Sequence, residues 1–105
     1  MNFFRILRDL KMRYFMAFTK CGNTDFEVLF ANLENLLIVL FASEIPSRLK
    51  LANVSKFRSE LELFCQRYER YVGDSLVHRL KVEILKLLDE ALKKWGIQDV
   101  LSEVL

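Results

Sequence analysis

The placement of glycine and proline limits what this chain can fold into. The sequence contains only three glycines and one proline. Gly22, Gly73 and Gly96 each follow a long helical pattern, at the position where a left-handed residue closes a helix. Pro46 stands where the first turn of a helix would begin, and its missing N–H is harmless there. A sandwich or barrel of short strands needs turn residues about every ten positions, so this distribution argues against one.

Apolar residues recur at helical spacing between these boundaries and predict four long helices. We expect the helices at about residues 2–20, 24–42, 46–72 and 75–95. The most regular apolar stripe belongs to the third helix, with members three and four residues apart: Val54, Phe57, Leu61, Phe64, Tyr68 and Tyr71. The stripe of the first helix consists of Phe3, Leu7, Leu10, Tyr14 and Ala17. The stripe of the fourth helix consists of Val77, Leu80, Ile84, Leu87, Leu88, Ala91 and Trp95.

Two features describe the second helix further. Thr24 and Glu27 have the spacing of a capping box, in which each side chain bonds the backbone N–H of the other residue. The run from Leu36 to Ala42 is apolar on all sides, which predicts that this helix is central and the most buried. Such a run also fits a buried strand, but the helical spacing upstream continues into it without a break. In the third helix, Asn53 also fits a helix start, which would make residues 46–52 a separate short turn.

The end of the chain predicts one further element. A short fifth helix is expected over residues 97–104, since Ile97, Val100, Leu101 and Val104 fall on one side of it. This segment would dock either on the end of its own bundle or in the groove of a partner. Short connections between long helices favour antiparallel neighbours. The sequence thus predicts a single all-α domain over residues 1–105, an antiparallel four-helix bundle with a short fifth C-terminal helix.

Charge is distributed unevenly along the chain. Residues 1–20 hold five basic residues and one acidic residue, a net charge of +4. Residues 21–45 hold four acidic residues and no basic one, a net charge of −4. We expect these two oppositely charged segments to pack side by side. The whole chain carries only +2, which is well short of the basic excess typical of a dedicated nucleic-acid domain.

Several features favour an intracellular, cytoplasmic protein. The longest stretch without a charged residue runs from Asn35 to Ser43, whereas a membrane-spanning helix needs about 20 apolar residues. The first residues mix arginine and aspartate into their apolar run, unlike a signal peptide. Cys21 and Cys65 are therefore expected in a reducing compartment, and a disulfide between them is not expected.

The residue types for catalysis or metal binding are scarce. His78 is the only histidine, and it falls at the edge of the polar side of its helix, which indicates a surface residue. Cys65 lies next to the apolar stripe of the third helix and fits a small core residue. Two cysteines and one histidine match no zinc-site spacing, and the isolated glycines form no phosphate-binding loop. We expect neither an enzyme nor a bound metal or cofactor.

The first helix carries apolar and basic residues together on the side opposite its apolar stripe. Phe4, Arg8, Lys11, Met12 and Phe15 share this side. It fits a contact with a second copy or another protein, an anionic membrane surface, or a nucleic acid whose bases stack on the rings. We favour the first, because excess apolar surface on a small domain most often marks protein contacts. The residues expected at such a partner interface are Phe4, Met12, Phe15, Leu63, Val104 and Leu105.

The sequence therefore predicts a non-enzymatic protein–protein interaction module. It would be a small helical accessory or structural subunit, acting as a homo-oligomer or within a larger complex. The alternative is a nucleic-acid-binding helical protein that uses its basic N-terminal helix. The contacts expected in that case are Arg5, Arg8, Lys11 and Arg13, with Lys56, Arg67 and Arg70 of the third helix. The polar side of the fourth helix, with Arg79–Glu83 and Lys86–Glu90 four apart, is expected to be solvated.

Overall fold

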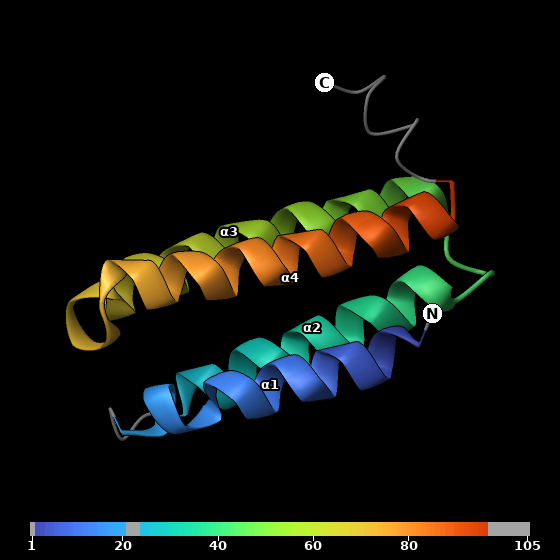
Figure 1. Ribbon diagram of the computed structural model, residues 1–105. Helices are drawn as coiled ribbons and strands as arrows, with labels where there is room; N and C mark the ends of the chain where they lie inside the picture. The colour runs from blue at the N-terminus through green and yellow to red at the C-terminus, as the bar shows by residue number, and fades with distance from the viewer. Residues whose placement is uncertain (1, 21–23, 97–105) are drawn as a thin grey trace.

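The computed structural model describes residues 2–20 and 24–96 of the chain. These residues form four helices: α1 (Phe3–Thr19), α2 (Asp25–Phe41), α3 (Ser47–Val72) and α4 (Asp74–Lys94). Consecutive helices run in opposite directions, and the α1–α2 hairpin lies beneath the α3–α4 hairpin in Figure 1. The predictions of an all-α fold and of four helices are confirmed. The predicted fifth helix, residues 97–104, lies outside the described residues.

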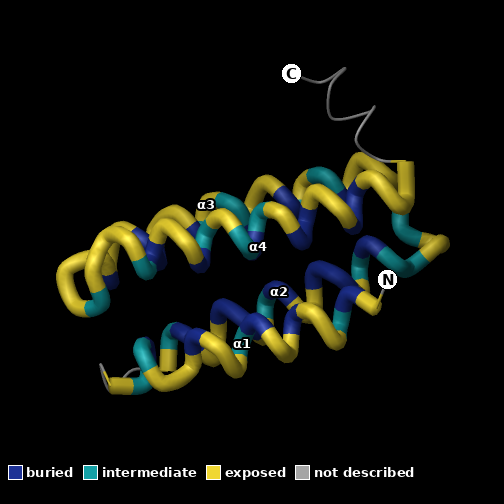
Figure 2. Tube along the Cα trace, viewed as in Figure 1, coloured by how far each residue is buried: buried dark blue, intermediate teal, exposed yellow. Residues whose placement is uncertain are grey.

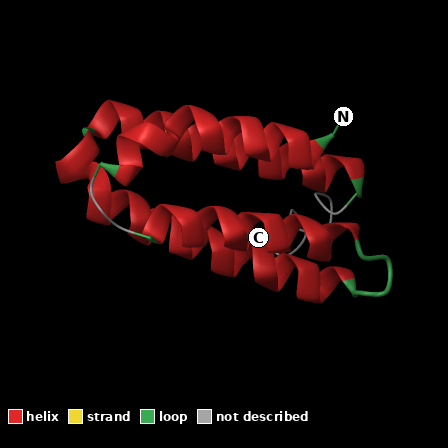
Figure 3. Ribbon diagram, turned by 90° about the horizontal axis from the view of Figure 1, so that it is seen from below, coloured by secondary structure: helices red, strands yellow, loops and turns green. Residues whose placement is uncertain are grey.

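Each helix occupies one corner of the bundle. The helix α1 contacts α2 and α4, and α3 contacts the same two helices. Figure 3 shows the four helices from below as an elongated bundle. As predicted, α2 has a larger share of buried residues than any other helix, and it contacts all three of them. It is not buried on all sides, however, because Val28 and Ile38 are 53% and 52% exposed. In a four-helix bundle every helix keeps an outer face in solvent, even where its sequence is apolar on all sides.

The core lies between the two hairpins, and the buried residues in Figure 2 lie on the helix sides that face it. The apolar stripes predict most of these residues, but the last members of three stripes are misplaced. Tyr71 of α3 is 70% exposed, and Trp95, just after α4, is 42% exposed. In α1 the fully buried residue is Phe18 rather than its neighbour Ala17. A repeat of alternating three and four residues advances 3.5 residues per turn, whereas the helix advances 3.6. The stripe therefore rotates out of the core after a few turns.

Aromatic rings join the helices at both ends of the core. At one end, the ring of Phe18 stacks on that of Phe26, with centroids 5.2 Å apart and an interplanar angle of 10°. The centroid of Phe64 lies 5.4 Å from that of Phe18, so this cluster connects α1, α2 and α3. At the other end, Phe41 contacts the rings of Phe3, Phe4 and Trp95. Much of the phenylalanine in the chain thus serves packing between helices.

The glycine and proline positions end or start helices as the sequence predicts. Gly73 and Gly96 have positive φ angles of 90° and 68°, which a residue with a side chain rarely adopts. Gly22 lies outside the described residues. Pro46 directly precedes α3, and its carbonyl accepts hydrogen bonds from the backbone N–H groups of Leu49 and Lys50. Its missing N–H leaves no donor unsatisfied at the start of the helix.

The expected capping box at Thr24 is wrong, and the alternative helix start at Asn53 is not used. The side chain of Thr24 makes no capping hydrogen bond, because the residue already has helix-like angles of φ −93° and ψ −2°. Asn53 lies inside the continuous helix α3, where its side chain donates to the carbonyl of Leu49 at 2.9 Å. Residues 46–52 are therefore not a separate turn. Of the four described helices, α1 has a side-chain cap, because Asn2 accepts a hydrogen bond from the backbone N–H of Arg5.

Candidate interaction surfaces

Among the described residues, five ion pairs cross between neighbouring helices. They are Lys11–Glu27, Arg13–Glu83, Arg58–Asp89, Arg67–Asp25 and Lys81–Glu62. All ten side chains remain partly exposed, so each pair stabilises the fold by only about 0–1 kcal/mol. Their larger consequence is for the surface, because Lys11, Arg13 and Arg67 are three of the seven basic residues expected to contact nucleic acid. Each of these three is paired with a carboxylate of its own chain.

Asp25 lies at the centre of a small polar cluster between α2 and α3. The hydroxyl of Tyr68 donates to Asp25 Oδ2 at 2.5 Å, and the Arg67 guanidinium donates to the same oxygen at 2.8 Å. The hydrogen bonds from Tyr68 and Arg67 lower the pKa of Asp25 below its ordinary value. The same hydrogen bond, assisted by burial, raises the pKa of Tyr68. The cluster thus holds a carboxylate and a neutral phenol at neutral pH.

A second polar cluster joins α1 to α4. Glu83 accepts hydrogen bonds from the hydroxyl of Tyr14 at 2.5 Å and from Arg13 at 2.8 Å. Burial alone would raise the pKa of Glu83, but the two hydrogen bonds outweigh it and lower this pKa. Burial and the bond to Glu83 raise the pKa of Tyr14. The side chain of Glu83 therefore turns towards α1, not outwards as the pattern of four-apart pairs on α4 predicts.

The outer α1/α2 face is the side of the first hairpin that points away from α3 and α4. It consists of exposed residues three and four apart on each helix: Arg5, Arg8, Met12 and Phe15 of α1, and Glu27, Ala31, Glu34 and Ile38 of α2. Met12 is 75% exposed, Ile38 52% and Phe15 38%. Two of the residues expected at a partner interface, Met12 and Phe15, lie on this face.

The other expected interface residues lie elsewhere. Phe4 is half-buried, and its ring packs on that of Phe41 at a centroid distance of 5.7 Å. Leu63 is 61% exposed on α3. Val104 and Leu105 lie outside the described residues. Among the basic residues expected to contact nucleic acid, Arg5 and Arg8 are exposed on α1, whereas Lys56 and Arg70 are exposed on α3.

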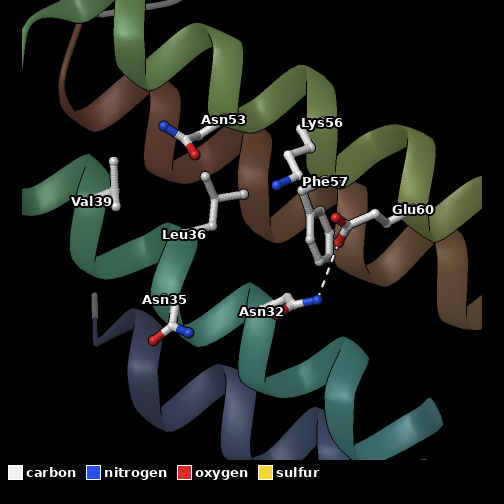
Figure 4. Close-up of a pocket in the computed structure, with 8 residues that line it drawn as sticks. All are labelled: Asn32, Asn35, Leu36, Val39, Asn53, Lys56, Phe57 and Glu60. Carbon is white, nitrogen blue, oxygen red and sulfur yellow. Dashed lines mark hydrogen bonds between the residues drawn. The ribbon is translucent and has the colours of Figure 1, made fainter.

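A groove runs along the seam between α2 and α3. Figure 4 shows one end of it, lined by Asn32, Asn35, Leu36, Val39, Asn53, Lys56, Phe57 and Glu60. The other end is lined by Asp25, Val28, Leu29, Leu63, Phe64 and Arg67, together with Asn32 and Glu60. The amide of Asn32 donates to Glu60 Oε2 at 3.1 Å and so bridges the groove at its middle. Both walls carry polar side chains, and the apolar side chains most exposed along the seam are Val28 and Leu63, at 53% and 61%.

The described residues bring no nucleophile to His78. The shallow pocket beside this histidine is lined by Arg13, Tyr14, Arg79, Val82 and Glu83. Cys65 is a buried free thiol on α3, and burial raises its pKa to about 11. Cys21 lies outside the described residues. Within residues 2–20 and 24–96 no three potential metal ligands come together.

Sequence reasoning missed several residues of these surfaces. Val28 and Ile38 were assigned to a buried helix, although both are more than half exposed. The signal that could have found them is the spacing of the polar residues in α2, because Asn32 and Asn35 interrupt an otherwise apolar sequence and mark the solvent side. The side of α1 that carries Met12 was found correctly, since one buried stripe defines its opposite face.

Comparisons of the chain with models of protein families, with curated proteins and with solved structures found no match. None of the helices in the described part of the chain is long and apolar enough to cross a membrane. The outer α1/α2 face and the groove between α2 and α3 are the two candidate interaction surfaces. Of the two, the outer α1/α2 face exposes the larger apolar side chains.

Proposed function

We propose that this protein is a non-enzymatic protein–protein interaction module, a small helical accessory or structural subunit that docks through its outer α1/α2 face. The observation that carries the proposal is the exposure of Met12 and Ile38 on this face, at 75% and 52%. Exposed apolar side chains gathered on one side of a small domain are typical of protein-contact sites. Methionine is suited to such a site, because its flexible and polarisable side chain adapts to an irregular surface.

Capture of partners by paired variants tests this function. The whole protein carries an affinity tag, and its stoichiometric partners are recovered from the cells that naturally make it. The Ile38→Lys variant places a charge on the outer α1/α2 face, whereas Val82→Lys makes the same kind of change on α4, where Val82 is 45% exposed. We expect wild type and Val82→Lys to retain the same partner, or a second copy, and Ile38→Lys to lose it.

Circular dichroism first establishes that both variants keep the helical fold. Two outcomes contradict the proposal. In the first, the wild-type protein is a monomer and captures nothing. In the second, Ile38→Lys captures the same partner as the wild type, which would show that the outer α1/α2 face is not the docking site.

Nucleic-acid binding stays the alternative, and Arg5 and Arg8 favour it. Both side chains are exposed, and neither is in an ion pair with another described residue. Phosphate contacts would make the affinity fall steeply as salt increases. Titration of labelled single- and double-stranded DNA and RNA at low salt tests this function. Binding tighter than about 100 μM with a steep salt dependence supports it, and weaker binding to all four rejects it.

A further inference from the structure

The outer α1/α2 face separates its charges between its two helices. The basic residues Arg5 and Arg8 lie on α1, whereas Glu27 and Glu34 lie on α2. Glu27 is paired with Lys11 at 2.7 Å. Within the described residues the side chains of Arg5, Arg8 and Glu34 are in no ion pair. The face thus presents one positive and one negative side that its own chain does not neutralise.

The contacts between α1 and α2 show which residues lie at the same height along the bundle. The rings of Phe15 and Phe26 have centroids 6.4 Å apart, and those of Phe4 and Phe41 are 5.7 Å apart. Lys11 and Glu27 form a third pair at one height. Because the two helices are antiparallel, the residue numbers of such a pair have a nearly constant sum, which is between 38 and 45 for these three pairs. Arg8 therefore lies at the height of Glu34, and Met12 at the height of Ala31.

This arrangement is complementary to itself under twofold symmetry. Consider a twofold axis that lies in the plane of contact and runs parallel to the helices. Rotation about it places α1 of one copy on α2 of the other, and every residue stays at the same height along the bundle. Arg8 of each copy then meets Glu34 of the other, and the long side chain of Met12 meets the small Ala31. An axis in the plane of contact but perpendicular to the helices would lay the basic α1 on α1 and the acidic α2 on α2, which like-charge repulsion disfavours.

We propose that the occupant of the outer α1/α2 face is a second copy of this chain, with α1 of each copy packed on α2 of the other. This inference rests on the proposed function, because it names the partner of the same face. The contact is small. Helices of 17 residues are about 25 Å long, and two side by side offer about 500 Å² per copy. A total of about 1,000 Å² lies at the lower limit for a specific interface, so we expect micromolar self-association.

Charge reversal tests the arrangement by sedimentation equilibrium over the micromolar range. Arg8→Glu brings Glu against Glu in the dimer, and Glu34→Lys brings Lys against Arg. We expect each variant alone to self-associate at least about tenfold more weakly than the wild type. An equal mixture of the two variants restores both contacts, so we expect it to form heterodimers with nearly wild-type affinity. The double variant Arg8→Glu/Glu34→Lys should also recover.

The control is Arg48→Glu, the same substitution at an exposed position in the first turn of α3. It should associate as the wild type does. A wild-type protein that stays monomeric at high micromolar concentration overturns the inference, while capture of a different protein by the same face would leave the proposed function intact. Charge-reversed variants that dimerise normally, or a mixture that fails to recover, also overturn it, because the charges would then not meet across the interface.

Discussion

Replacing Phe18 with alanine removes the ring that joins three helices at one end of the core. Phe18 is fully buried, and its ring contacts those of Phe26 on α2 and Phe64 on α3. Among the described residues of α1, no other ring contacts rings on two different helices. We therefore expect Phe18→Ala to destabilise the whole bundle and not only the end of α1.

The expected loss follows from the burial. Truncating a buried phenylalanine costs about 3–5 kcal/mol, which combines lost transfer free energy with the cavity left behind. A domain of this size has an unfolding free energy of about 5–15 kcal/mol, so the variant loses a large share of its stability. For about 100 residues, each kcal/mol corresponds to about 4–8 °C. The melting temperature should fall by at least about 10 °C.

Phe15→Ala is the matched control, because the same ring is removed three residues away on the same helix. Phe15 is 38% exposed and makes one ring contact, with Phe26 at 6.4 Å. We expect a loss of about 1 kcal/mol. Urea unfolding followed by circular dichroism at low protein concentration measures both variants without a contribution from self-association.

Phe18→Leu keeps the measurement informative if the alanine variant does not fold. Leucine retains most of the apolar contact and loses the ring pairs, so its cost should be about 1–2 kcal/mol. The reasoning is refuted if Phe18→Ala costs no more than Phe15→Ala. That result would mean that the bundle end closes without the aromatic cluster.

Two further predictions concern titratable groups. Tyr68→Phe removes the hydrogen bond that lowers the pKa of Asp25 below its ordinary value of 3.8. The stabilisation from a carboxylate with a lowered pKa is present above that value and is lost as the pH falls through the folded-state pKa. The variant should thus be less stable than the wild type at neutral pH, with a smaller difference at about pH 2.5 by urea unfolding; an equal difference at both would contradict this. In a Cys21→Ser background, Cys65 should react with a disulfide reagent far more slowly in the native protein than in urea, because burial raises its pKa to about 11. Rapid labelling of the native protein would show that α3 opens readily at this position.

Local chemistry made most of the fold predictable. Gly73 and Gly96 end helices because their backbones adopt positive φ. Glycine adopts such angles without steric cost, so these helix ends can be predicted from the residue type. The apolar stripes predict the inward sides of α1, α3 and α4 because each stripe has a polar side to contrast with it. In α2 the contrast is weaker. Its polar residues between Val28 and Ile38 are only Asn32, Glu34 and Asn35, and the exposure of the two apolar residues was missed.

The surfaces were harder to predict, because they depend on which helices become neighbours. The basic residue Arg13 belongs by pattern to the exposed side of α1, yet Glu83 of α4 lies within 2.8 Å of it. Lys11 likewise has its carboxylate partner 16 positions away along the sequence, on α2. Helical periodicity assigns a residue to one side of its helix. It does not indicate which charged side chains the adjacent helix places next to that residue. The exposed side of α1 could therefore be predicted, but not how many of its charges the fold neutralises.

The ion pairs show that the opposite charges of the first two helices do more than hold these helices together. Within the described chain only one ion pair, Lys11–Glu27, joins these two helices. Arg13 is instead paired with α4 and Asp25 with α3, and Arg8 and Glu34 remain unpaired within the described chain at equal heights on one face. Exposed pairs contribute little to folding, so the fold does not require this separation of charge. An interface that must select one orientation of a second copy does require it, since complementary charge fixes register and disfavours the alternative.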